Sequence, residues 1–197
     1  MVKIGFVPSH RLPFSRGWAI EMRKRTIKSI EKSIKDVEII CPDEKITDGG
    51  LVTCNEDARK VIDLFKENNI HGLLIGMMTF GEEIPNLMIA EEFKDKPIQI
   101  FGTKEGPFKK DGNRKSDSFC GTISTASGLV RRKINFDFSG IYFPEEEDFL
   151  KNLERFIKVV NAYESFYGMR IGAIGPRPAP FETCAINEVD LIEKFRI

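Results

Sequence analysis

The sequence has few cysteines and histidines, and none of them are spaced like metal ligands. No CxxC motif occurs, and the only histidines are His10 and His71. The four cysteines are widely separated: Cys41, Cys54, Cys120 and Cys184. A structural zinc site is therefore not expected. Isolated cysteines of this kind are usually reduced and buried in proteins of a reducing compartment, so we expect a cytoplasmic protein with reduced, buried thiols.

Long apolar runs and an excess of one charge are also missing. No run approaches the roughly 18 apolar residues of a membrane span, and the first residues lack the apolar core of a secretion signal. The 30 basic residues balance 30 acidic ones, which argues against a nucleic-acid binder that depends on a basic field. The basic segment Lys104–Lys115 is a local exception. It is either a solvated loop or a loop that meets an anionic or polyhydroxylated ligand.

What the sequence does contain is a regular alternation of strand and helix patterns. The expected strands are Lys3–Val7, Val37–Ile40, Gly72–Met77, Pro97–Phe101 and Gly140–Phe143. The expected helices are Trp18–Ile34, Asn55–Asn68 with Asn55 as its N-cap, Glu83–Phe93, Ser118–Lys133 capped by Asp117 or Ser118, and Pro144–Tyr167. This alternation predicts an α/β fold: a flavodoxin-like, doubly wound, mostly parallel five-stranded sheet with strand order 2-1-3-4-5.

The final segment has the pattern of a domain that is beginning. Met169–Gly175 looks like a buried strand that runs into a glycine turn, and Cys184–Phe195 has helical spacing. One strand and one helix cannot cover each other's apolar faces and form an independent core. We therefore expect residues 1–167 to form the first domain. Residues 168–197 would be the opening strand and helix of an incomplete second α/β domain, in a truncated chain or as an appendage that docks on itself or on a partner.

The expected fold also says where a site would lie. In open α/β sheets, ligands bind beyond the carboxyl ends of the strands, near the point where the strand order reverses. The loops at that edge carry hydroxyl, guanidinium, imidazole and aromatic groups, which suit a sugar, a polyol or a sugar phosphate. The candidate substrate-binding residues are His10, Arg11, Arg16, Met78, Thr79, Phe80, Glu82 and Cys120. No catalytic triad or metal cluster stands out, and neither a G-x-G-x-x-G nor a Walker A motif supports nucleotide binding.

Each of these candidates also has a purely structural interpretation. His10 beside Arg11 fits a surface turn as well as a ligand contact, although its pKa lies in a useful range. Glu82 fits the cap of the following helix. Cys120 lies at an expected helix start, where the pKa of a thiol can fall, but no base partner is identifiable and a small structural residue fits equally.

Three segments carry a family resemblance. Asp117-Ser118-Phe119-Cys120-Gly121-Thr122-Ile123-Ser124, Thr79-Phe80-Gly81-Glu82 and Gly172-Ala173-Ile174-Gly175-Pro176-Arg177-Pro178 resemble segments of L-fucose/L-arabinose isomerase-type proteins. The resemblance covers nearly the whole chain. It implies a flavodoxin-like first domain followed by the beginning of a second α/β domain.

The resemblance also implies a chemistry. Members of this family are ketol isomerases in which a divalent metal, typically manganese, polarises the sugar carbonyl and hydroxyl. Their Glu, Asp and His ligands come from later domains, so no cofactor is expected on this chain itself. In these enzymes an arginine of the first βα loop and a tryptophan after the third strand help to hold sugar at a neighbouring subunit's site. Arg11 or Arg16 would match the arginine, and Met78 takes the tryptophan's place.

Three functional hypotheses follow. The first is the N-terminal part of a sugar (aldose–ketose) isomerase-like protein, which contributes oligomer contacts and the rim of a carbohydrate site. It implies a homo-oligomer or missing downstream domains, and no isomerisation by this chain alone. The second is a stand-alone flavodoxin-like module that binds a sugar or sugar phosphate without catalysis. The third is a flavin-binding electron carrier, which the first loop disfavours because it lacks a Ser/Thr/Gly-rich phosphate nest.

Overall fold

The structure, a computed structural model, describes residues 1–197 and divides into two units. The first unit is Met1–Val160 and the second is Asn161–Ile197. The division falls inside a long C-terminal helix, a few residues before the domain boundary expected from the sequence. The two units are described separately below.

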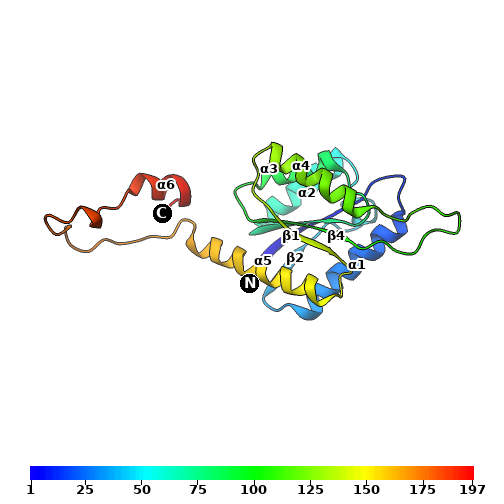
Figure 1. Cartoon of the computed structure of the whole chain (residues 1–197), viewed down its shortest axis with the longest axis horizontal. Helices are drawn as coiled ribbons and strands as arrows, with labels where there is room; N and C mark the ends of the chain where they lie inside the picture. Colours follow the sequence, from blue (N-terminus) through cyan, green and yellow to red (C-terminus); the bar gives the residue numbers. More distant parts are fainter. The chain divides into compact units, whose positions relative to one another are not determined.

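The first unit is built on one parallel sheet. Its strands are β1 (Val2–Ser9), β2 (Val37–Ile40), β3 (Gly72–Met77), β4 (Ile98–Thr103) and β5 (Asp137–Tyr142). They pair in the order β2-β1-β3-β4-β5, and each pair is parallel (Figure 1). This arrangement confirms the flavodoxin-like, doubly wound five-stranded sheet and the strand order that the sequence predicts.

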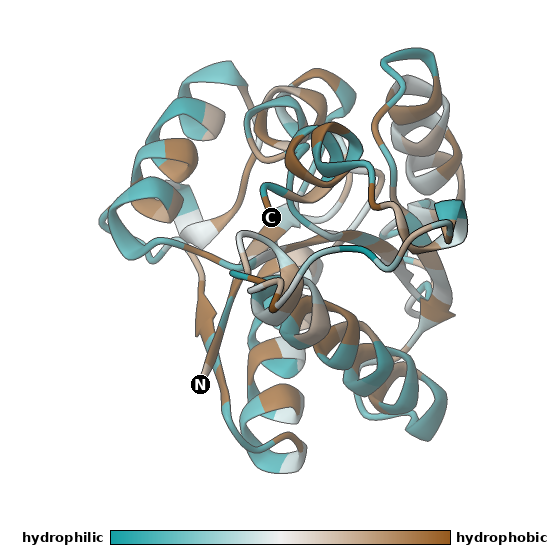
Figure 2. Ribbon diagram, turned by 90° about the vertical axis from the view of Figure 1, so that its left-hand side faces the viewer, coloured by the Kyte–Doolittle hydropathy of each residue, from teal (hydrophilic) through white to brown (hydrophobic).

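Helices cover both faces of this sheet. The helices are α1 (Arg16–Ser33), α2 (Asn55–Asn68), α3 (Glu83–Glu92), α4 (Ser118–Arg131) and α5 (Glu147–Phe166). Helices α1 and α5 lie on one face, and α2, α3 and α4 lie on the other (Figures 1 and 2). Each layer closes its own hydrophobic core against the sheet, so every residue of the central strands β3 and β4 is buried. Strands covered on both faces are expected to be continuously apolar, as β3 is. In β4 the buried polar side chains Gln99 and Thr103 donate hydrogen bonds to the Asp137 carboxylate and the Met77 carbonyl.

The start of α2 differs from the expectation. Asn55 was expected as the N-cap, but the N-cap is Cys54, whose side chain makes no capping hydrogen bond. The Asp57 carboxylate reaches back instead and accepts hydrogen bonds from the backbone N–H and the hydroxyl of Thr53, at 2.9 and 2.7 Å. This side chain organises the entrance to the helix because it satisfies donors that precede the first turn.

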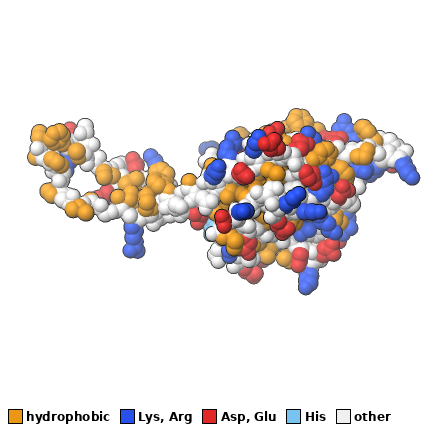
Figure 3. Space-filling view, turned by 90° about the horizontal axis from the view of Figure 1, so that it is seen from below, with side chains coloured by type: hydrophobic (Ala, Val, Ile, Leu, Met, Phe, Trp, Pro, Cys, Tyr) orange, Lys and Arg blue, Asp and Glu red, His pale blue; other side chains and the backbone are white.

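The second unit has little regular structure. Met169–Gly175, expected to be a strand, is irregular, because no neighbouring strand pairs with it. A short 3₁₀ turn at Glu182–Cys184 and the helix α6 (Glu188–Phe195) follow. No residue from Asn161 to Ile197 is buried, and Ile174, Phe181 and Ile186 are among its exposed apolar side chains (Figure 3). As the sequence indicates, the apolar residues of this unit do not form a core of their own.

The contact between Asp57 and Thr53 gives a first test. We expect Asp57→Ala to lower the free energy of unfolding by about 1–2 kcal/mol, because it removes the acceptor for two donors at the helix entrance. Asp57→Asn keeps an acceptor oxygen and should cost less. Urea denaturation of both variants measures this. Glu56→Ala, at the exposed neighbouring position, is the control, and a cost equal to that of Asp57→Ala would contradict this role of Asp57.

Candidate functional site

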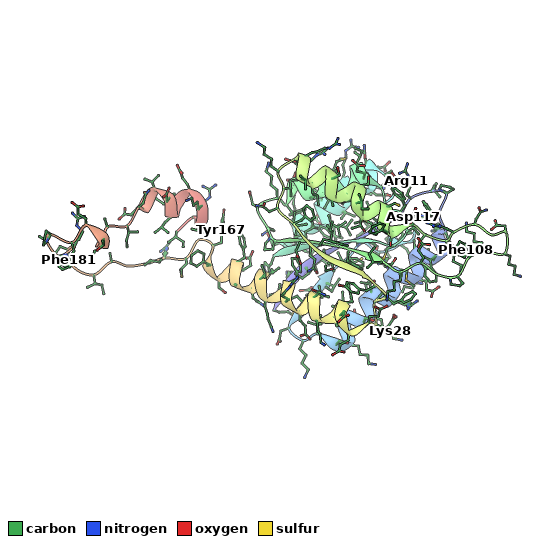
Figure 4. The ribbon with its side chains drawn as sticks, viewed as in Figure 1. Arg11, Lys28, Phe108, Asp117, Tyr167 and Phe181 are labelled. Carbon is green, nitrogen blue, oxygen red and sulfur yellow. The ribbon has the colours of Figure 1, made fainter.

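The candidate site lies where the strand order of the sheet reverses. Strands β1 and β3 are neighbours, but the chain leaves them toward opposite faces, to α1 and α3. The carboxyl ends of such a strand pair are the usual position of a ligand in open α/β sheets. The loops after β1 and β3 bring together Ser9, His10, Arg11, Thr79, Phe80 and Glu82, which we call the switch-point site. Figure 4 labels Arg11 at this end of the first unit.

His10 and Thr79 form the inner part of the switch-point site. His10 is 1% exposed, and its Nδ1 lies 2.8 Å from the Thr79 hydroxyl oxygen. The backbone N–H of Arg11 also donates to that oxygen, at 3.3 Å. The other ring nitrogen of His10, Nε2, is buried and has no hydrogen-bond partner. A buried polar atom without a partner is costly, so it marks a place where a further group would be stabilising.

The environment of His10 fixes its charge. Burial, together with the smaller effect of the positive charge of Arg16, lowers the pKa of His10 from 6.5 to about 4. The imidazole is therefore neutral at pH 7. A neutral imidazole has one donor and one acceptor nitrogen, which suits a hydroxyl group better than it suits an anion.

Arg11, Phe80 and Glu82 form the outer part of the switch-point site. The Arg11 guanidinium carbon lies 5.0 Å from the centre of the Phe80 ring, and its Nε lies 3.7 Å from a carboxylate oxygen of Glu82. Phe14 stacks on Phe80, with ring centres 5.9 Å apart. Partial burial raises the pKa of Glu82, and the charge of Arg11 opposes that rise. The Arg11 side chain is 47% exposed, so its remaining donors are accessible to a ligand.

Ser9 holds the two loops together. Its hydroxyl accepts a hydrogen bond from the backbone N–H of Glu82 at 2.9 Å, and its carbonyl accepts one from the N–H of Met78, also at 2.9 Å. The intervening Gly81 has φ of +82°, a left-handed conformation that disfavours other residues. The loop after β3 is therefore fixed at both ends against the end of β1. Ser9 is not one of the candidate residues of the sequence analysis, although it lies just after the first expected strand, Lys3–Val7.

The remaining candidates lie elsewhere. Arg16 pairs with Asp48, with Nε 2.9 Å from a carboxylate oxygen, although its charge still reaches His10. Met78 is fully buried in the core beneath α1 and α5, so its side chain does not face solvent at the site. Cys120 is exposed in the first turn of α4. The pKa of the Cys120 thiol is raised, first by a hydrogen bond with the Asp117 carboxylate and then by desolvation and the negative charge of Asp117. The helix N-terminus therefore does not convert this thiol into a reactive thiolate.

The start of α4 packs directly on the loop after β3. A Cβ atom on Gly121 would lie 1.4 Å from the carbonyl oxygen of Phe80, so only glycine fits there. The Ser118 hydroxyl donates to the carbonyl of Thr103 instead of capping its own helix, and the N-cap is Asp117, whose side chain makes no capping hydrogen bond. Helix α4 thus supports the outer wall of the switch-point site.

Several basic side chains of the loop after β4 form ion pairs or a cation–π contact with neighbouring residues. Lys104 pairs with Glu146 at 2.7 Å, and Arg114 lies 3.7 Å from both Glu105 and Asp117. Lys115 lies over the ring of Trp18, 5.1 Å from its centre. Phe108, at the tip of this loop, is 66% exposed (Figure 4). Several of the basic side chains that could meet an anionic ligand are therefore already paired within the protein. Acidic and basic groups are also mixed on the face shown in Figure 3.

The donor groups do not fit a resident metal ion. No three His, Cys, Asp or Glu side chains of the chain come together in a group that would hold one. Manganese, which the family resemblance implies for complete proteins, therefore finds no set of ligands among these 197 residues, and we derive no step through it.

The comparison with protein families decides the assignment. Residues 5–167 match the N-terminal domain of the fucose/sulfoquinovose isomerases. The chain belongs to this family. The match spans nearly all of the sheet, both helical layers and the switch-point site, and it confirms the suspected family. The third segment that suggested this family, Gly172–Pro178, lies beyond the matched residues. No curated protein matches the sequence. No helix of the chain combines the length and apolar character that crossing a membrane requires.

The burial of His10 predicts a pH dependence of stability. Because its pKa is lowered from 6.5 to about 4, the unfolded chain binds a proton in this range that the folded chain excludes. The stability that the protein gains from burying a neutral His10 ring is therefore complete above pH 6.5 and is lost as the pH falls toward 4. We expect the stability advantage of the wild type over His10→Asn, measured by urea denaturation, to shrink over that range. A difference that stays constant with pH would show that His10 is not buried as a neutral ring.

The close contact between α4 and the loop after β3 predicts that a side chain at Gly121 lowers the stability of the protein. Gly121→Ala should destabilise the first unit by about 3 kcal/mol or more, because the new methyl group overlaps backbone atoms that cannot move aside easily. Gly17→Ala is a matched control in α1, where a Cβ atom would have nothing within 4 Å. It should be neutral or stabilise by up to about 1 kcal/mol. Equal melting temperatures for the two variants would contradict the packing described here.

Proposed function

We propose that this chain is the N-terminal part of an aldose–ketose isomerase-like protein of carbohydrate metabolism, in which it supplies the rim of a carbohydrate site and oligomer contacts. The observation that carries the proposal is the switch-point site. A buried neutral imidazole with an unpartnered nitrogen lies there beside a hydroxyl, a guanidinium and an aromatic ring. The four free cysteines support a cytoplasmic location, because they are typical of a reducing compartment.

The chemistry of the switch-point site favours a polyhydroxylated ligand. Sugar hydroxyls both donate and accept hydrogen bonds. The Glu82 carboxylate, whose side chain is 30% exposed, can accept them, whereas His10 and Thr79 are buried. Arg11 adds charged donors, which form stronger hydrogen bonds than neutral groups do. The Phe80 ring provides an apolar surface beside them. Arg11 is also the better counterpart of the sugar-binding arginine that the resemblance implies, because it lies over Phe80 in the switch-point site, whereas Arg16 is held in a close pair with Asp48.

The chain alone is not expected to isomerise sugars. The family's metal and its ligands are implied for later domains, and the acids and imidazoles of this chain do not assemble a metal site. A rim that meets only one side of a sugar binds weakly, with dissociation constants in the millimolar range or above, about −4 kcal/mol.

One observation favours a second candidate function. The unit Met1–Val160 has a complete sheet with a closed core on each face, as a protein that functions alone would have. A stand-alone sugar- or sugar-phosphate-binding module would differ from a rim in affinity, because it would need to enclose its ligand without help.

A titration of the ¹⁵N-labelled chain with L-fucose, L-arabinose and sulfoquinovose tests the proposal. We expect amide shifts at Arg11, Thr79 and Phe80 with millimolar affinity. Arg11→Ala should weaken binding about tenfold, which corresponds to roughly 1.4 kcal/mol. Arg25→Ala is a matched control, because Arg25 also pairs with a glutamate, Glu145, and lies over a ring, Phe143, at 5.1 Å. It should bind like the wild type.

The other outcomes are equally informative. Micromolar affinity would favour the stand-alone module. The absence of shifts at the switch-point site with every sugar at 100-fold excess over the protein would contradict both functions. An aldose–ketose assay with added manganese should show no turnover, and robust turnover by this chain would overturn the assignment to a non-catalytic rim.

A further inference from the structure

Helix α4 carries an apolar stripe on its outer surface. Phe119, Ile123 and Val130 are 57%, 53% and 66% exposed. Together with the half-buried Ala126 they are spaced by four, three and four residues, so their side chains lie within about 60° of one another around the helix axis. The outer face of α2 is different, since its exposed residues are all polar. The stripe is therefore a feature of α4 and is not shared by every helix in this layer.

The stripe lies on the side of α4 that faces the edge of the sheet. The opposite flank packs against α3, where Ser124 bonds Glu83 and the Thr125 hydroxyl lies 3.2 Å from the Asn86 amide nitrogen. The sheet edge on the stripe's side is β5. Phe138 of β5 pairs in register with Ile100, which belongs to the core beneath α2, α3 and α4, so Phe138 projects toward the same face of the sheet. Phe138 is 46% exposed and extends the apolar surface at this edge.

We propose that this surface is the contact between two copies of the chain, with the two α4 helices packed antiparallel around a two-fold axis. The spacing of four, three and four reads the same in both directions. An antiparallel partner therefore brings Phe119 opposite Val130, and Ile123 opposite Ala126, in both halves of the contact. Such self-complementarity is what a two-fold interface requires.

The charges at the two ends of α4 favour the same arrangement. Asp117 precedes the helix, and Arg131, Arg132 and Lys133 end it. Antiparallel packing places the acidic end of each helix near the basic end of the other and opposes the two helix dipoles. A parallel arrangement would bring the two basic ends together and is disfavoured.

The size of the surface predicts a weak dimer. Stable interfaces bury about 800 Å² on each partner and involve about 20–30 residues a side, whereas the stripe and Phe138 supply fewer large apolar groups. We therefore expect a monomer–dimer equilibrium in the micromolar range. This inference rests on the proposed function only in that both include contacts between copies of the chain. The dimer is tested without sugar, so the dimer contact and the sugar site can each fail independently of the other.

Sedimentation equilibrium over a range of protein concentrations tests the surface. The wild type should dimerise, and Ile123→Asp should raise the dissociation constant by about 100-fold or more, because it buries a charge at the centre of the contact. Ile123 is exposed, so circular dichroism should show an unchanged monomer. Val159→Asp on α5, at a position 52% exposed, is the control and should dimerise normally. A wild type that stays monomeric at all concentrations, or an Ile123→Asp variant that still dimerises, would overturn the proposal.

Cross-linking tests the orientation. Cys120 and Ser127 lie on the same flank of the stripe, on either side of its midpoint, so an antiparallel dimer brings Cys120 of one copy near Ser127 of the other. One protein carries Cys54→Ser and Cys184→Ser and keeps Cys120. A second adds Cys120→Ser and Ser127→Cys. Mixing them with a short bis-maleimide should give a covalent heterodimer joined at positions 120 and 127. The first protein alone should give almost none, and efficient linkage of Cys120 to itself would indicate parallel helices and refute the model.

Discussion

The pairing of β1 with β3 is the constraint on which the rest of the structure depends. The two strands run parallel from Ile4 beside Gly72 to Ser9 beside Met77, and their chains then leave toward opposite faces of the sheet. That single register places the imidazole after one strand beside the hydroxyl after the other. A shift of one strand by one residue would move its side chains to the other face of the sheet and separate the pair. The chemistry of the switch-point site is thus a direct result of how the core is packed.

Most of the fold was predictable because its signals are local. Short apolar strands that alternate with amphipathic helices leave few alternatives, and right-handed crossovers then determine which face each helix covers. The switch-point position follows from strand order alone, so the sequence already pointed to His10 and Thr79. Their hydrogen bond and the low pKa of His10 were not predictable, since both depend on burial produced by distant residues.

The structure differs from the sequence-based expectations at residues whose position depends on contacts with distant parts of the chain. The sequence places Arg16 at the site, but in the structure it pairs with the carboxylate of Asp48, 32 residues away. Asp48 lies in a polar loop, and no sequence pattern there identifies it as the partner of Arg16. Met78 follows an apolar strand and continues into the core, because side chains alternate along the chain and the loop turns only after it. Met169–Gly175 has the composition of a strand, but a strand exists only when another strand pairs with it.

The contact between Gly121 and Phe80 links two surfaces that are otherwise distant in function. Helix α4 begins against the carbonyl of Phe80, the aromatic residue of the switch-point site, and the close approach leaves no space for a side chain at Gly121. A displacement of the Phe80 backbone toward α4 would press directly on the first turn of the helix that carries the apolar stripe. If a ligand binds beside Phe80 and α4 pairs with a second copy, as proposed, any coupling between the two events would pass through this contact and act equally in both directions.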